Sequence, residues 1–149
     1  MVGAIARPRR LARGRRNPSG RLARPQVIKL VFVIRRREDL PPEEFHRYWL
    51  EEHGPLAGGL LRSLGARRYV QTHTLATDLN VALAAARGTG EAYDGLAEVW
   101  WDSLDALVAA STSEEGQRAN ETLMEDEARF IDLERSSFFV TEEHAILEG

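Results

Sequence analysis

The sequence contains no cysteine, which excludes disulfide bonds, thiolate nucleophiles and cysteine-ligated metals. Its purely apolar runs, such as residues 30–34, are far shorter than the roughly 20 residues that span a bilayer, so we expect no association with a membrane. A chain without cysteine fits a reducing compartment. We therefore expect a cytoplasmic protein.

Several nucleotide-binding, nucleophile and metal motifs are also missing. The sequence has no Gly-x-Ser-x-Gly segment, and Gly88-Thr89-Gly90 lacks both the third glycine and the preceding strand of a dinucleotide-binding loop. No two of the four histidines have the His-x-x-x-His spacing of a metal-binding pair. These absences argue against a Rossmann enzyme that uses nicotinamide or flavin, and we expect neither a cofactor nor a metal.

Acidic residues are absent from residues 1–25, which carry eight arginines. Because the whole chain has a net charge of −3, the remaining residues carry a net charge of −11. An arginine-rich arm of this kind can bind nucleic acid or an acidic surface, and its composition is shared with organelle transit peptides. Since it has no aromatic residues for base stacking and no apolar periodicity, we expect residues 1–25 to be a disordered arm without a specific nucleic-acid partner. Residues 26–149 are expected to form one domain.

The most informative stretch is a cluster of aromatic residues within residues 42–53. Phe45, Trp49 and His53 are spaced by four positions, so they share one face of the predicted helix together with Tyr48. Gly54-Pro55 is typical of a helix end, which predicts that the helix ends at His53. We expect the aromatic stripe to enter a core and a loop to follow, which contains Gly58-Gly59 and Leu60-Leu61.

Four segments have the apolar or alternating pattern of strands: residues 27–34, 66–75, 93–101 and 136–147. A short alanine-rich turn, Val81 to Ala86, is expected between the second and third strands. After the third strand, Asp102-Ser103 is expected to cap a helix to about Ala110, and a capping box at residues 111–114 begins a second helical segment with breaks, to about Asp132. The order βαββαβ predicts an α+β, ferredoxin-like fold.

Two helices cover only one face of such a sheet, so the other face needs a different cover. Tyr69, Gln71 and His73 alternate on one side of the second strand, and we expect this polar and aromatic face to be the uncovered one. On the third strand, Asp94, Leu96, Glu98 and Trp100 share one face. A second copy of the same sheet is the economical cover, which predicts a homodimer with a barrel between the subunits and a pocket inside the barrel.

Six runs of residues occur in the order of one known family: residues 29–33, 42–56, 68–73, 93–100, 126–132 and 139–144. Together they resemble the EthD family of dimeric α+β barrels. The resemblance extends over about Val27 to Glu148 and leaves out the arginine-rich arm. It agrees with the fold and the dimer that the strand pattern predicts.

The resemblance implies a small organic substrate of apolar or aromatic character that binds in the barrel pocket. It implies either cofactor-independent isomerase or dehydratase chemistry, or the oxidoreductase activity with which EthD proteins are often associated. Two alternatives stay open. One is a non-catalytic accessory protein that binds a ligand for an oxygenase pathway, and the other is a haem-binding barrel.

Isomerisation, dehydration and enolisation need a base near a C–H or O–H bond and a donor for the oxyanion that develops. We expect His53 to act as base or acid, Tyr69 and His73 to orient or protonate the substrate, and Glu98 to pair with one imidazole. Residues expected to bind the substrate are Trp49, Gln71, Asp94, Trp100 and His144. Structural explanations also stay open: a helix cap for His53, interface polar groups for Tyr69 and His73, a structural role for Glu98, and core packing for the tryptophans.

Overall fold

The fold is built on one four-stranded antiparallel sheet. The computed structural model describes residues 27–149, so the arginine-rich arm expected at residues 1–25 lies outside the described residues. The strands are β1 (Ile28–Ile34), β2 (Arg68–His73), β3 (Gly95–Trp101) and β4 (Ser137–Glu142). They lie in the order β2-β3-β1-β4, and each neighbouring pair is antiparallel. This order confirms the predicted α+β, ferredoxin-like fold.

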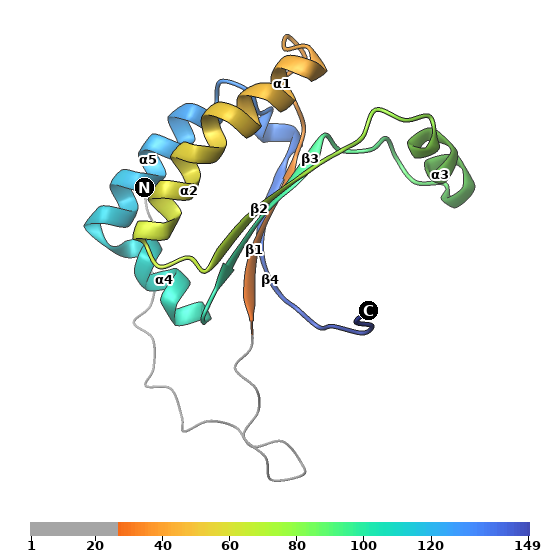
Figure 1. Ribbon diagram of the computed structural model, residues 1–149. Helices are drawn as coiled ribbons and strands as arrows, with labels where there is room; N and C mark the ends of the chain where they lie inside the picture. Colours follow the sequence, from red (N-terminus) through yellow and green to blue (C-terminus); the bar gives the residue numbers. More distant parts are fainter. Residues whose placement is uncertain (1–26) are drawn as a thin grey trace, which may run out of the picture.

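The helices that join β1 to β2 and β3 to β4 cover one face of the sheet (Figure 1). Between β1 and β2 lie α1 (Pro42–Tyr48), a π turn (Trp49–His53) and α2 (Gly54–Ser63), and between β3 and β4 lie α4 (Leu104–Thr112) and α5 (Glu114–Glu127). Ser103 caps α4 by accepting a backbone N–H group, as the sequence predicts. Ser113 caps α5 in the same way, two residues after the start of the predicted capping box, because α4 extends to Thr112. A 3-10 turn (Leu133–Arg135) then leads into β4. None of the helices in residues 27–149 is long and apolar enough to cross a membrane.

The prediction that the first helix ends at Gly54-Pro55 is wrong, because the helix continues through these residues. The N–H of Gly54 bonds to the carbonyl of Trp49, five residues back, which forms the π turn. Pro55 therefore falls in the first turn of α2, where its missing N–H is tolerated. The predicted loop at residues 58–61 is likewise wrong, since these residues lie inside α2.

The predicted aromatic stripe does enter the core. Phe45 and Trp49 are 0% and 1% exposed, and they pack with Ile34, Phe130 and Ile131. Beneath Trp49 the chain has Gly95, where an added Cβ would lie 2.5 Å from the indole ring. A second buried cluster at the other end of the sheet consists of Ile28, Val99, Trp101, Leu107 and Ala110.

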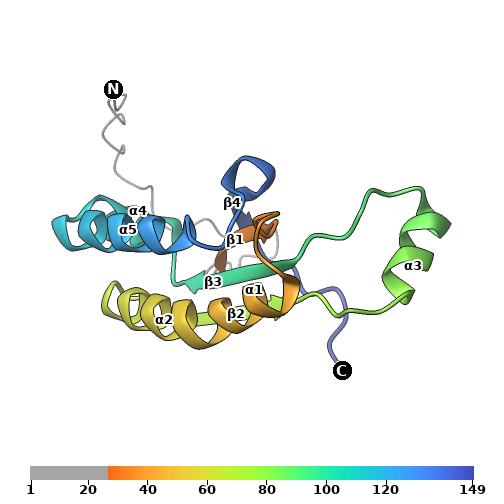
Figure 2. The same cartoon turned by 90° about the horizontal axis from the view of Figure 1, so that it is seen from above.

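A further helix, α3 (Leu79–Arg87), interrupts the connection from β2 to β3. It extends the short turn predicted at residues 81–86, and Gly88 ends it in the left-handed conformation with φ 67°. Figures 1 and 2 show α3 well away from the other helices, beyond the opposite face of the sheet. Its apolar side chains Leu79, Val81 and Leu83 are exposed.

The two faces of the sheet are assigned the wrong way round in the sequence prediction. Tyr69, Gln71 and His73 pair with Val99, Ala97 and Gly95, which places them on the face that the helices cover. A period of two separates the faces of a strand but does not show which one a helix covers. The open face instead carries Lys29, Val31, Val33, Arg68, Val70, Thr72, Leu96, Glu98, Trp100, Phe139 and Thr141.

Candidate functional site

A pocket lies between the sheet and the helices α2, α4 and α5, on the covered face rather than inside a barrel between subunits. Its volume is about 470 Å³, which is within the range of small-molecule sites. Its walls are mostly apolar, and Glu127 is the one charged residue among the described residues that line it. The lining residues are Leu30, Phe32, Leu61, Leu64, Trp101, Leu107, Ala110, Ser111, Gly116, Asn120, Leu123, Met124, Glu127, Leu133, Ser136, Ser137 and Phe138.

A smaller compartment of about 70 Å³ adjoins this main pocket toward the π turn. Trp49, His53 and Tyr69 line it, so three residues singled out from the sequence do meet at one site. The two compartments share part of their walls, formed by Leu30, Phe32, Leu61, Leu123, Glu127 and Phe138. Glu127 is therefore placed where it faces both spaces.

Glu127, the last residue of α5, is the group that the sequence prediction missed. Burial raises the pKa of its carboxyl to about 7, and the negative charge of Asp126 acts in the same direction. Within residues 27–149 no hydrogen-bond donor or cation is paired with this carboxylate. The signal was present in the helical spacing, because Gly116, Ala119, Leu123 and Glu127 follow one another at three or four positions on one stripe.

Asp126 points to a different set of partners, which join α5 to the first helix. Its Oδ2 lies 2.7 Å from Nδ1 of His53, and its Oδ1 accepts a hydrogen bond from the Tyr48 hydroxyl at 2.5 Å. Burial lowers the pKa of His53, although Asp126 acts in the opposite direction. A neutral imidazole donates from Nδ1 to Asp126, which leaves Nε2 as an acceptor. His53 can therefore act as a base or a hydrogen-bond acceptor in the smaller compartment.

A line of hydrogen bonds runs along β2 from the pocket toward α1. Gln71 Nε2 donates to the Trp49 carbonyl at 2.8 Å and to the Tyr69 hydroxyl oxygen at 2.9 Å. Its Oε1 lies 2.8 Å from Nε2 of His73, and Nδ1 of His73 lies 2.7 Å from Nδ1 of His46. Burial lowers the pKa of both histidines, so their neutral forms are favoured.

The partners in this line determine which atom donates and which accepts in each hydrogen bond. The Trp49 carbonyl can only accept, so the amide nitrogen of Gln71 must face it and the amide oxygen must accept from His73 Nε2–H. Neutral His73 then accepts at Nδ1 from His46 Nδ1–H. Because the Tyr69 oxygen already accepts from Gln71, its own proton is available for donation elsewhere. Burial raises the pKa of this hydroxyl, and Glu127 adds to the rise.

Glu98 and Trp100 lie on the open face of the sheet, away from the pocket. The predicted pairing of Glu98 with an imidazole is wrong, because its carboxylate lies 3.4 Å from Nζ of Lys29. The indole N–H of Trp100 donates to Glu143 at 2.9 Å. These contacts bind the strands to one another and do not bring either residue near His53.

Asp94 and His144 also lie outside the pocket, which the sequence did not predict. Asp94 accepts a hydrogen bond from the backbone N–H of Arg36 at 2.7 Å, which holds the entrance to β3 against the end of β1. The fourth strand was predicted to extend to Leu147 but ends at Glu142. The exposed His144 lies beyond it, with Nε2 3.2 Å from Oε1 of Glu142. Neither residue is among those that line the two compartments.

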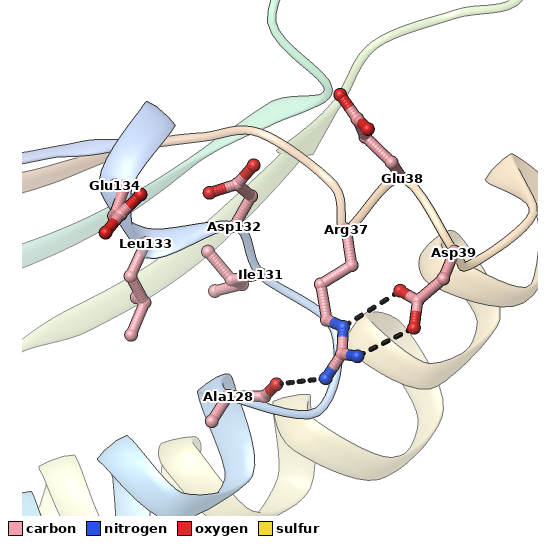
Figure 3. A pocket seen from close by; sticks show the side chains of 8 residues that line it. All are labelled: Arg37, Glu38, Asp39, Ala128, Ile131, Asp132, Leu133 and Glu134. Carbon is pink, nitrogen blue, oxygen red and sulfur yellow. Dashed lines mark hydrogen bonds and ion pairs between the residues drawn. The ribbon is translucent and has the colours of Figure 1, made fainter.

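A separate hollow of about 460 Å³ lies on the surface beside the end of α5. Figure 3 shows that Arg37 crosses it, with two hydrogen bonds to Asp39 and one to the carbonyl of Ala128. Its guanidinium is thus already matched by a carboxylate and holds residues 37–39 against the turn after α5. This hollow has the features of a structural contact rather than of a binding site.

Metal ligands do not gather anywhere in residues 27–149: no three His, Asp or Glu side chains come together as a metal site requires. The pocket has its own acids, bases and hydrogen-bond donors. These are Glu127, His53 with Asp126, and Tyr69 with its line of hydrogen bonds.

The EthD domain matches residues 37–134, which is more than half of the chain. The chain belongs to the EthD family. The match includes the π turn, the line of hydrogen bonds along β2 and both carboxylates at the end of α5. The resemblance found in the sequence is therefore confirmed. No curated protein sequence matches the chain at a significant level.

Solved structures support the same fold. An EthD family protein from Bacillus halodurans is 19% identical, with a TM-score of 0.55, over 79% of this chain and 99% of the other. An EthD-like protein from Ralstonia eutropha is 17% identical, with a TM-score of 0.53, over 83% and 96%. A dimeric protein of unknown function with a ferredoxin-like fold, from Bacteroides fragilis, is 15% identical, with a TM-score of 0.51, over 78% and 96%. At these identities the likeness concerns the fold.

Proposed function

We propose that this EthD protein binds a small, largely apolar organic molecule in the pocket between sheet and helices and transfers a proton on it without a cofactor. The observation that carries this proposal is Glu127, whose carboxyl has its pKa raised to about 7 in an apolar wall. A structural carboxylate in such a place is normally paired with a cation or with donors, because its burial is costly. An unpaired one with a pKa near neutrality suits a general base or acid.

The reaction class that fits is enolisation, the step common to many isomerases and dehydratases. Ionised Glu127 takes a proton from a C–H bond next to a carbonyl group. The electron pair of that C–H bond forms the C=C bond of the enolate, and the π pair of the carbonyl moves onto its oxygen. The Tyr69 hydroxyl, whose proton is not used within the line along β2, donates a hydrogen bond to the oxyanion. Protonated Glu127 then returns the proton to another carbon, or to a leaving hydroxide in a dehydration.

Within this proposal the residues of the smaller compartment have distinct roles. His53, oriented by Asp126, presents Nε2 as a second acceptor of protons. Gln71 and His73 are positioning residues that direct the Tyr69 proton and do not themselves line the two compartments. Trp49 forms part of the wall of the smaller compartment.

A binding protein without catalysis is the alternative, and the apolar character of the pocket favours it. Glu127 is a single charged group among seventeen lining residues, so a hydrophobic molecule would be held mainly by burial of its surface. Such a protein would bind an apolar ketone but would not exchange its protons.

Deuterium exchange into 2-tetralone separates the two functions. This bicyclic ketone has acidic C–H bonds next to its carbonyl group, and proton NMR in D₂O measures their loss. We expect the protein to accelerate the exchange and Glu127→Gln to reduce that acceleration by at least about a hundredfold, the usual scale of general-base catalysis. Glu125→Gln, which changes an exposed acid on the same turn, is the matched control and keeps the acceleration. Binding with exchange at the buffer rate would favour the non-catalytic alternative.

We also propose that two copies pair through the open face of the sheet. Apolar side chains lie across all four strands of this face, and they include Val33, Val70, Leu96 and Phe139. In a monomer this apolar surface would be exposed to water. In a dimer the same face of a second copy would cover it, so that the same residues of both copies form the interface. The dimeric relative from Bacteroides fragilis has the same fold, which supports this assembly.

A further inference from the structure

The α3 arm, residues 74–94, projects from the sheet on the side of its open face. It leaves β2 after His73 and returns to β3 at Gly95. Figures 1 and 2 show that α3 lies beyond the open face, on the side away from α1, α2, α4 and α5. The carboxyl-terminal segment, residues 143–149, runs on the same side. Two projections therefore extend from the side of the sheet that no helix covers.

Contacts at the base of the arm hold it in this direction. The backbone N–H of Thr74 donates to the carbonyl of Asp94 at 3.0 Å, and its hydroxyl donates to the carbonyl of Tyr93 at 2.6 Å. Arg35, directly after β1, donates to the carbonyl of Ala92 at 2.7 Å, and its guanidinium carbon lies 3.9 Å from the centre of the Tyr93 ring. The direction of the arm is thus set by its base and does not depend on what α3 touches.

α3 has the composition of a buried helix but is exposed. Seven of its nine residues are Leu, Val or Ala, and the other two are Asn80 and Arg87. These two are seven positions apart, so they share one narrow stripe and the rest of the circumference is apolar. None of the nine is buried, and Leu79, Val81 and Leu83 are 59%, 73% and 55% exposed. Because so short a helix is marginal in water without packing, α3 needs a surface to pack on.

The distribution of exposed apolar residues favours a second copy of this chain as that surface. Among the large apolar residues described, the four most exposed are Leu75 and Val81 in the arm, and Ile146 and Leu147 in the carboxyl-terminal segment. All four belong to the two projections beside the open face, which carries apolar side chains of its own. A copy placed over the open face would occupy the space next to both projections. One partner would then cover the sheet and the arm in a continuous interface.

The arm is long enough to reach past the sheet of such a copy. Packed sheets lie about 10 Å apart, and residues 74–78, which lead to α3, span up to about 17 Å when extended. A membrane surface fits less well. α3 carries one cation, Arg87, and lacks the row of Lys and Arg with which helices bind anionic lipid.

We infer that α3 of each protomer packs on the second copy of the chain, so that both arms of a dimer extend the interface formed by the open faces. This inference rests on the proposed pairing through the open face for the place of the second copy. It gives the arm a function in assembly, and it predicts that α3 is covered in the dimer and exposed in the monomer.

Single thiols test this contact, because the chain has no cysteine of its own. Val81→Cys places a thiol on α3, and the control Val108→Cys places one on α4. In one protomer Val81 is the more exposed of the two, 73% against 44%. If α3 were free, its thiol would react with Ellman's reagent at least as fast as the control. In the dimer we expect the Val81→Cys thiol to react at least about tenfold more slowly than the control, because it reacts only when the arm opens.

A monomeric background completes the test. Leu96→Asp combined with Val81→Cys should restore the fast reaction, whereas the Val108→Cys thiol should react equally fast with and without Leu96→Asp. A Val81→Cys thiol that reacts in the dimer as fast as Val108→Cys would overturn the contact. That comparison needs no monomeric variant, so it decides the matter even where Leu96→Asp does not fold.

The α3 contact and the proposed pairing fail separately. Fast reaction at α3 in a dimer that Leu96→Asp dissociates would keep the pairing and remove the contact. Slow reaction at α3 in a dimer that survives Leu96→Asp would keep the contact and remove the pairing through the open face. A monomeric unaltered protein would contradict both. The proposed proton transfer is tested independently, since deuterium exchange depends on Glu127.

Discussion

The imidazole of His53 and the carboxylate of Asp126 form a buried pair, with Nδ1 2.7 Å from Oδ2. The pair joins the π turn to the last turn of α5, although 73 positions separate the two residues in the chain. Tyr48 donates to the other oxygen of the same carboxylate. Asp126 therefore fixes the position of the smaller compartment relative to Glu127, its neighbour in the sequence.

Asp126→Asn should destabilise the protein by about 1–3 kcal/mol, because an amide has one oxygen for the two donors and its NH₂ group faces the other. Urea unfolding measures this loss. Glu125→Gln, one position earlier and exposed, should change the free energy of unfolding by less than about 0.5 kcal/mol. Equal stability of the two variants would show that the pair with His53 contributes nothing.

The line along β2 predicts the tautomers of two histidines. Neutral His73 should carry its proton on Nε2 and neutral His46 on Nδ1, since Gln71 sets the direction of both bonds. Long-range ¹⁵N–¹H NMR spectra above pH 7 identify the protonated nitrogen of each ring. In Gln71→Leu the constraint is lost, so a mixture of tautomers is expected. A mixture of tautomers in the unaltered protein would contradict these hydrogen-bond directions.

Leu96→Asp should convert the expected dimer into a monomer, because it places a charge among the apolar side chains of the open face. Light scattering coupled to size-exclusion chromatography measures the mass. Val108→Asp is the matched control, since Val108 is 44% exposed on α4, on the helical side of the molecule. A dimer that persists in Leu96→Asp, or a monomeric unaltered protein, would rule out pairing through this face.

Glu127→Gln should remove a pH-dependent loss of stability. The carboxyl has a pKa of about 7 in the folded protein against an ordinary value of 4.5, so ionisation disfavours the folded state as the pH rises between these values. At pH 8 and above the variant should be more stable, by at most about 3 kcal/mol, whereas below pH 4 the advantage disappears. Urea unfolding at several pH values measures the difference. Parallel stability curves for the two proteins would contradict the raised pKa.

Periodic features of the sequence predicted the fold well. The stripe of Phe45 and Trp49 and the four alternating segments gave the order and type of the elements, because each repeats a local rule over several residues. The sequence did not predict that the helix continues through Gly54-Pro55. Glycine and proline are typical of a helix end, whereas the π turn that carries the helix past them depends on a single hydrogen bond across five residues, which leaves no periodic pattern.

The candidate site was predicted in part. His53 and Tyr69 were chosen for their chemistry, and both line the smaller compartment together with Trp49. Glu98 was chosen on the same grounds but lies on the other face, because the sequence does not reveal which face of the sheet the helices cover. Glu127 was not singled out because α5 contains many acidic residues. Its position on the apolar stripe of the helix was the signal that could have distinguished it from the others.

Titration of the Glu127 carboxyl tests the central claim most directly. In protein with ¹³C-labelled glutamate side chains, the Cδ resonance reports ionisation, and its absence from the spectrum of Glu127→Gln identifies it. Burial without a partner predicts a midpoint near pH 7. A midpoint near the ordinary value of 4.5 would show a solvated carboxylate and would contradict its role as the proton-transferring group of this pocket.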